Sequence, residues 1–73
     1  MPKACILIKA VPTATERVVE MVRKTGVAWK VFSTYGRWDI VAYFNAPAEE
    51  IGKISATINS FEGVRSSETL PEA

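Results

Sequence analysis

Histidine is absent from this sequence, and cysteine occurs only once, at position 5 of 73 residues. An intramolecular disulfide is therefore impossible, and a zinc site built from Cys and His within one chain is excluded. A domain of this size buries little apolar surface and often needs a disulfide, a metal or a partner subunit. The absences thus leave oligomerisation as the expected source of added stability. Cys5 lies in an apolar run, and we interpret it as a core residue rather than a nucleophile.

Long hydrophobic runs and concentrations of one charge are also lacking. The longest apolar run, Ala4 to Ile8, is too short to span a bilayer or to act as a signal peptide, so we expect no membrane partner. The net charge is +1 and the basic residues are scattered, which argues against direct binding of nucleic acid. A free cysteine without an export signal predicts a cytoplasmic protein. No phosphate loop, catalytic triad or metal-ligand set occurs, so we expect no catalytic residues, no metal and no cofactor.

The sequence does contain an alternation of strand-like and helix-like segments with little between them. Apolar and β-branched runs predict strands over residues 3–10, 27–34, 39–45 and 64–70. The first helix is expected after Pro12, with Thr13 and Glu16 as a capping box and Gly26 beyond its last turn. The second is expected to begin at Pro47 and to end at Gly63. Its buried stripe consists of Ile51, Ile54, Ile58 and Phe61.

This order, strand–helix–strand repeated twice, predicts an α+β, ferredoxin-like βαββαβ fold as one domain over residues 1–73. We expect a four-stranded antiparallel sheet with its first and third strands at the centre and both helices on one face. Both faces of these strands are apolar, however: on the first strand, Ile6 and Ile8 oppose Cys5 and Leu7. Because the helices can cover only one face, the other is expected to pack against a second copy in a two-fold dimer.

On the second strand, the same alternation places Trp29 on one side with Val31, opposite Phe32. The third strand sets Val41 and Tyr43 against its other apolar residues. Both strands therefore agree with a sheet that is apolar on its two faces.

The connection between the second and third strands carries more aromatic and charged residues than a tight turn needs. Gly36 and Asp39 alone would satisfy a hairpin, because glycine adopts positive φ and aspartate accepts bonds from backbone N–H groups. Tyr35 and Trp38, beside Arg37, are residue types enriched at binding sites. A carboxylate beside backbone N–H donors can also hold the charged groups of a free amino acid. The candidate ligand-binding residues are Thr34, Tyr35, Gly36, Arg37, Trp38 and Asp39.

Ser66 and Ser67 in the last strand form a second candidate. Hydroxyl groups at a sheet edge can line a polar pocket together with a neighbouring subunit. The simpler interpretation is an edge strand whose polar side chains block further pairing. Glu49 and Glu50 diverge by about 100° on a helix, so we interpret them as charges that favour its first turn and not as a catalytic pair.

Three stretches resemble the effector-binding domain, or RAM domain, of Lrp/AsnC transcription regulators: CILIKA, GVAWKVFSTYGRWDIVAYF and FEGVRSSETL. The most specific match is a glycine, two variable residues and an aspartate, here Gly36 and Asp39. The resemblance implies a homodimer formed through the sheets, further assembly into tetramers, octamers or decamers, and an amino acid bound between dimers near residues 34–39. It implies that Gly36 and Asp39 contact the amino-acid head group and that Tyr35, Arg37 and Trp38 shape the pocket or the dimer–dimer contact. Ser66 and Ser67 are weaker matches.

Full-length regulators of this family carry a helix-turn-helix DNA-binding domain, whereas this sequence begins with Met1 two residues before its first strand. We therefore expect a stand-alone member that senses an amino acid or modulates full-length Lrp/AsnC regulators. Two other classes share the topology: small dimeric α+β barrel enzymes, and ACT domains, which also bind amino acids. The enzymes usually present a histidine, which is absent here. ACT domains more often pair their sheets side by side, so a face-to-face sheet dimer would distinguish them.

Overall fold

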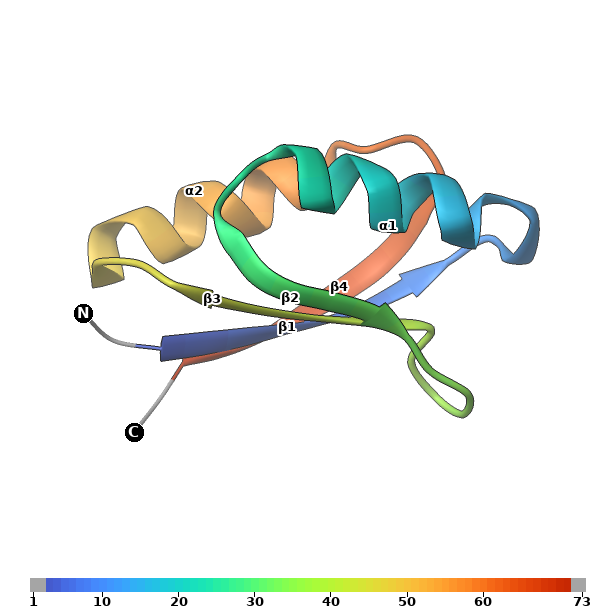
Figure 1. The fold of residues 1–73 in the computed structure, drawn as a ribbon, viewed down its shortest axis with the longest axis horizontal. Coiled ribbons are helices and arrows are strands. Elements are labelled where there is room, and N and C mark those ends of the chain that lie inside the picture. Colours follow the sequence, from blue (N-terminus) through green and yellow to red (C-terminus); the bar gives the residue numbers. More distant parts are fainter. Residues whose placement is uncertain (1–2, 72–73) are drawn as a thin grey trace.

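The computed structural model describes residues 3–71. The elements are β1 (Lys3–Ala10), a short 3-10 helix η1 (Pro12–Ala14), α1 (Thr15–Lys24), β2 (Ala28–Ser33), β3 (Ile40–Asn45), α2 (Ala48–Asn59) and β4 (Val64–Pro71) (Figure 1). The strand order is β2-β3-β1-β4, and every neighbouring pair is antiparallel. The ferredoxin-like fold, with β1 and β3 at the centre of the sheet, is therefore confirmed.

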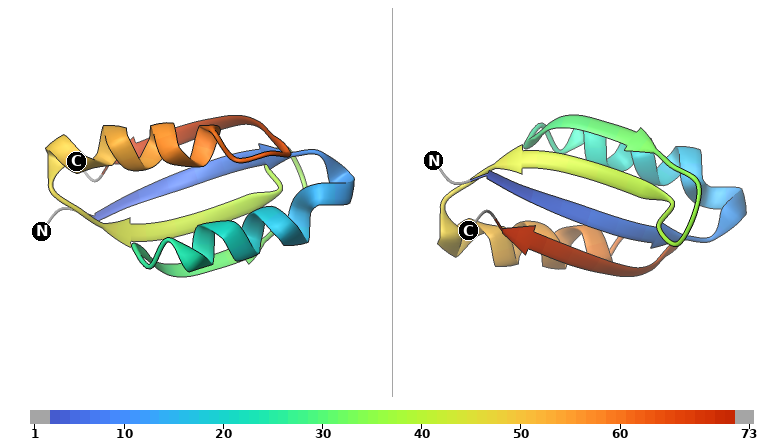
Figure 2. Two further views of the ribbon diagram at one scale, coloured as in Figure 1. Left: turned by 90° about the horizontal axis from the view of Figure 1, so that it is seen from above. Right: turned by 90° about the horizontal axis from the view of Figure 1, so that it is seen from below.

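Both helices lie on one face of the sheet, which we call the covered face (Figures 1 and 2). Alternate residues of the two central strands point beneath the helices. The largest fully buried side chains are Phe44, Ile6, Ile8, Ile40, Ile58, Val18 and Val22. Each stabilises the fold by about 1.5–3 kcal/mol relative to an exposed position, so this layer is the core. Within residues 3–71, no helix is long and apolar enough to cross a bilayer.

Helix α1 begins later than the capping-box pattern predicts. The N-cap is Ala14, and no side chain caps the helix. Thr13 lies instead inside η1, because the N–H of Ala14 donates to the carbonyl of Val11 at 2.8 Å and closes a 3-10 turn that begins at Pro12. The predicted Thr13 N-cap is therefore wrong. Helix α2 likewise begins at Ala48, with Pro47 as its N-cap rather than its first residue.

Strand β2 contains a bulge that the alternation of residues did not reveal. Ala28 pairs with Phe44 and Lys30 pairs with Tyr43, so Trp29 is an extra residue in the register. The Trp29 ring stacks on the Tyr43 ring, with 5.4 Å between centroids and 22° between planes. The prediction that Trp29 shares a face with Val31 is therefore wrong. The bulge turns Trp29 to the side of the sheet away from the helices.

That side of the sheet, which we call the open face, is not covered by any part of the chain that the structure describes. Its apolar residues are Cys5, Leu7, Trp29, Phe32, Val41, Tyr43 and Leu70, of which Trp29 is 59% and Leu70 is 45% exposed. The Phe32 ring lies 6.0 Å from that of Tyr43, and Lys30 Nζ lies 5.6 Å from the Phe32 centroid. The expected second apolar face thus exists, whereas the dimer that would cover it stays a prediction.

Candidate functional site

The loop joining β2 to β3, residues 34–39, is called the hairpin loop and is closed by hydrogen bonds at its base. The Thr34 N–H donates to the Asp39 carbonyl at 2.8 Å, and Thr34 Oγ1 donates to the Trp38 carbonyl at 2.6 Å. Gly36 has a φ of +122°, which side chains other than hydrogen disfavour. The Tyr35 side chain is fully exposed. The loop therefore has a hydrogen-bonded base and presents an aromatic side chain to its surroundings.

Asp39 joins the hairpin loop to the end of β1. Its N–H donates to the Ile8 carbonyl at 3.0 Å, and its Oδ2 accepts from the Ala10 N–H at 2.9 Å in a partly buried position. The β1–β4 register shifts between Lys9 and Ala10, at the same place. The carboxylate therefore has a structural role through Oδ2, while Oδ1 keeps acceptor capacity for another partner.

Asp39→Ala is expected to destabilise the fold by about 1–3 kcal/mol, because the Ala10 N–H loses its acceptor in a partly buried position. Asp39→Asn keeps an oxygen that can accept this bond and removes only the charge, so we expect a loss below about 1 kcal/mol. Urea unfolding followed by tryptophan fluorescence measures both changes. Equal losses in the two variants would contradict this role of the hydrogen bond. The Asn variant is therefore the better one for ligand experiments.

The remaining residues of the hairpin loop have few contacts within the chain. The Arg37 carbonyl accepts from Lys9 Nζ at 3.4 Å, and the Arg37 side chain is exposed. Trp38 is half-buried. These side chains are therefore available for contacts beyond the chain, which agrees with the predicted role of Arg37 and Trp38 without testing it.

Ser66 and Ser67 lie on opposite sides of β4 and are not brought together with Asp39. Ser67 pairs with Ile8, and its Oγ donates to Asn59 Oδ1 of α2 at 2.8 Å on the covered side. Ser66 pairs with Lys9 and is exposed on the other side. Strand β1 separates both serines from the hairpin loop. Within this chain, Ser67 has a structural contact, and any ligand contact of either serine stays a prediction.

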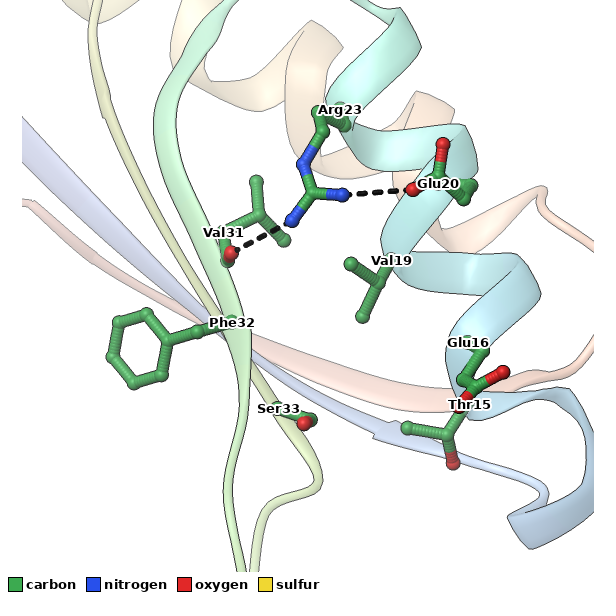
Figure 3. A pocket seen from close by; sticks show the side chains of 8 residues that line it. All are labelled: Thr15, Glu16, Val19, Glu20, Arg23, Val31, Phe32 and Ser33. Carbon is green, nitrogen blue, oxygen red and sulfur yellow. Dashed lines mark hydrogen bonds and ion pairs between the residues drawn. The ribbon is translucent and has the colours of Figure 1, made fainter.

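Two neighbouring hollows lie along α1 and β2. The first, of about 410 Å³, is beside the hairpin loop and is lined by Pro12, Thr13, Thr15, Glu16, Ser33, Thr34, Tyr35 and Asp39. The second, of about 430 Å³, is between α1 and β2 and is lined by Thr15, Glu16, Val19, Glu20, Arg23, Val31, Phe32 and Ser33 (Figure 3). Because they share Thr15, Glu16 and Ser33, we treat them as one continuous feature, the α1–β2 groove. Sequence reasoning found its loop side but missed its α1 side.

Arg23 closes the end of the α1–β2 groove that lies away from the hairpin loop. One guanidinium nitrogen donates to Glu20 Oε1 at 2.7 Å, and the other donates to the Val31 carbonyl of β2 at 3.4 Å (Figure 3). Val19 points from α1 across the groove toward β2, while the Phe32 ring points away from the helix (Figure 3). The groove therefore has a polar end at the loop, an apolar stretch at Val19 and an ion pair at its far end.

Cys5 is half-buried on the open face and does not belong to the buried core, so its interpretation as a core residue is wrong for the single chain. Desolvation by burial raises the pKa of its thiol, which lowers the fraction of reactive thiolate at neutral pH. Within residues 3–71, no three His, Cys, Asp or Glu side chains cluster in a way that could hold a metal ion.

No protein-family model matches the sequence, and no curated protein matches it either. Solved structures do share its fold. TTHA0845 from Thermus thermophilus superposes with a TM-score of 0.94 at 28% identity, over 100% of this chain and 94% of that chain. FFRP-DM1 gives 0.91 at 16% identity over 100% of both chains. MtbAldR gives 0.82 at 12% identity, over 99% of this chain and 52% of that chain.

FFRP-DM1 is a feast/famine regulatory protein of the Lrp/AsnC family, and MtbAldR is an Lrp-type regulator. This chain has a RAM-like fold. The resemblance inferred from the sequence is therefore supported at the level of the fold. Two features of this RAM-like chain are candidates for function: the open face of the sheet, and the α1–β2 groove with the hairpin loop at its end.

Proposed function

We propose that this chain is a regulatory module of the Lrp/AsnC type that assembles through its open face and binds a free amino acid beside the hairpin loop. The observation that carries the proposal is an apolar sheet face without cover from residues 3–71. A surface of this kind is typical of a protein–protein contact. The RAM-like fold shared with FFRP-DM1 and MtbAldR supports regulation over catalysis.

In the proposed assembly, the open faces of two copies pack against each other around a two-fold axis. The exposed side chains of Tyr35 and Arg37 then contact neighbouring dimers and build a larger particle, such as an octamer or decamer. The module senses its ligand directly or co-assembles with full-length Lrp/AsnC regulators, and those partners, not this chain, contact DNA. A face-to-face sheet dimer also separates this function from that of an ACT domain.

In the proposed ligand site, the α-ammonium of an amino acid binds Asp39 Oδ1, and its α-carboxylate accepts from hydroxyl groups in the polar end of the α1–β2 groove. Thr13 and Ser33 are both exposed and line this end. Gly36 lets the tip of the hairpin loop fold beside them. The residues predicted from the sequence thus supply one side of the site and α1 supplies the other.

Two measurements test this function: a thermal-shift screen of the common L-amino acids, and light scattering on the protein as it elutes from a size-exclusion column. We expect an oligomer whose melting temperature rises with at least one amino acid, because a ligand at a hundred times its Kd adds about 2.7 kcal/mol to stability. A folded oligomer that responds to no amino acid would contradict the ligand part. A monomer at every concentration would contradict the assembly part.

A further inference from the structure

The charges along the α1–β2 groove indicate which amino acids would fit it. We propose that the groove selects an amino acid with a cationic side chain, such as L-lysine, over amino acids with neutral or acidic side chains. This inference rests on the proposed function, because it names the chemical class of the ligand for the same site.

The groove carries an excess of negative charge. Three carboxylates line it, Asp39, Glu16 and Glu20, against one cation, Arg23. Three negative charges and one positive charge give a net charge of −2. Arg23 is paired with Glu20 at 2.7 Å and also donates to the Val31 carbonyl, so its charge is offset by a carboxylate of the same groove. An added carboxylate would therefore compete with Glu20 for the one cation among the lining residues.

The two remaining carboxylates, Asp39 and Glu16, lie at different places in the groove and can pair with different ends of a bound amino acid. Asp39 belongs only to the hollow beside the hairpin loop, whereas Glu16 borders both hollows. A free amino acid has one α-ammonium and so satisfies only one of these two carboxylates. A neutral side chain leaves the other unpaired, whereas a side-chain ammonium supplies its partner.

The rest of the lining fits the same orientation. The hydroxyl groups of Thr13 and Ser33, and the N-terminal end of α1 at Thr15, suit the α-carboxylate, since a helix N-terminus carries partial positive charge. An amino acid whose α-ammonium is held at Asp39 and whose side chain is short would not reach the second carboxylate.

The expected selectivity is modest because the groove is open to solvent. Glu16 is an exposed residue, and ion pairs in such positions are weak and screened by salt. We expect L-lysine to bind about fivefold more tightly than L-norleucine, which has the same chain without the side-chain ammonium. L-glutamate is expected to bind most weakly of the three.

Isothermal titration of the assembled protein with L-lysine, L-norleucine and L-glutamate tests the proposal. Glu16→Gln should bring the affinity for L-lysine down to that for L-norleucine. Glu50→Gln, which removes an exposed carboxylate from the first turn of α2, should leave the preference unchanged. Raising the salt concentration should reduce the preference in the wild type.

Equal affinity for L-lysine and L-norleucine, or a preference that survives Glu16→Gln, would overturn the charge selectivity while amino-acid binding itself stands. If none of the three ligands binds, the selectivity is overturned. If, in addition, no other amino acid responds in the thermal-shift screen, the ligand part of the proposed function is overturned as well. Cadaverine, which keeps both ammonium groups of lysine and lacks its carboxylate, separates the roles. If cadaverine binds the wild-type protein and this binding is lost in Glu16→Gln, the preference for a cation is supported without any contact to the α-carboxylate.

Discussion

Val41→Asp is expected to convert the assembled protein into a monomer. Val41 lies on the open face, paired with Leu7 of β1 and Phe32 of β2. In a two-fold dimer the change occurs twice, so two carboxylates would be placed against an apolar partner surface. A cost of about 4 kcal/mol weakens association roughly a thousandfold. Light scattering coupled to size-exclusion chromatography over a range of protein concentrations measures the change in mass.

Val11→Asp is the matched control, because it makes the same chemical change at an exposed valine between β1 and η1. This variant is expected to keep the wild-type mass. Far-ultraviolet circular dichroism should show both variants folded, since neither valine belongs to the buried core. A Val41→Asp protein with wild-type mass, or a Val11→Asp protein that dissociates equally, would contradict assembly through the open face.

Gly63→Ala is expected to produce the largest loss of stability of any single methyl addition considered. Gly63 has a φ of +98°, and an added Cβ would lie 2.6 Å from the Cβ of Ala14. The Gly63 carbonyl also accepts from the Val11 N–H at 2.8 Å, so the backbone here cannot shift freely. Strain and overlap together should cost about 3 kcal/mol, which lowers Tm by roughly 12–24 °C in a domain of this size. Thermal unfolding followed by circular dichroism measures it.

Gly26→Ala provides the comparison for backbone strain alone. Gly26 has a φ of +76°, but an added Cβ would meet nothing within 4 Å, so a loss of about 1 kcal/mol is expected. The double change Ala14→Gly with Gly63→Ala should recover part of the larger loss by removing the overlap. If Gly63→Ala costs no more than Gly26→Ala, the close approach of η1 to the α2–β4 connection is not a determinant of stability.

The fold could be predicted because its signals are local and repeated. The apolar strand over residues 3–10, the stripe of α2 and the glycines after each helix indicate their structures within short windows. The start of α1 could not be predicted in the same way, since a backbone bond from Ala14 to Val11 competes with the Thr13 cap. The face of Trp29 was missed because a bulge depends on the pairing of two strands and not on the alternation within one.

The candidate site was accessible to sequence reasoning only where its residues are contiguous. The hairpin loop is one continuous segment, and its aromatic and charged residues identify it as a candidate binding site. Glu16 approaches β2 only after α1 has packed against the sheet, so no local pattern connects it to Asp39. The contact between Asp39 and Ala10 spans 29 residues and uses a backbone N–H, which carries no sequence signal. Two features are therefore known only from the structure: the side of the groove that α1 forms, and the hydrogen bond by which Asp39 stabilises the fold.

The guanidinium of Arg23 also hinders the addition of another strand at the β2 edge of the sheet. Arg23 donates a hydrogen bond to the Val31 carbonyl at the outer edge of β2, and the bulge at Trp29 interrupts the same edge. An incoming strand would have to displace the guanidinium and would meet an irregular register, and β4 at the opposite edge ends in Pro71. Lateral growth of the sheet into an open-ended fibre is thus disfavoured. Association through the open face would instead bury the apolar surface that drives it, so this mode of association would end at the two-fold pair.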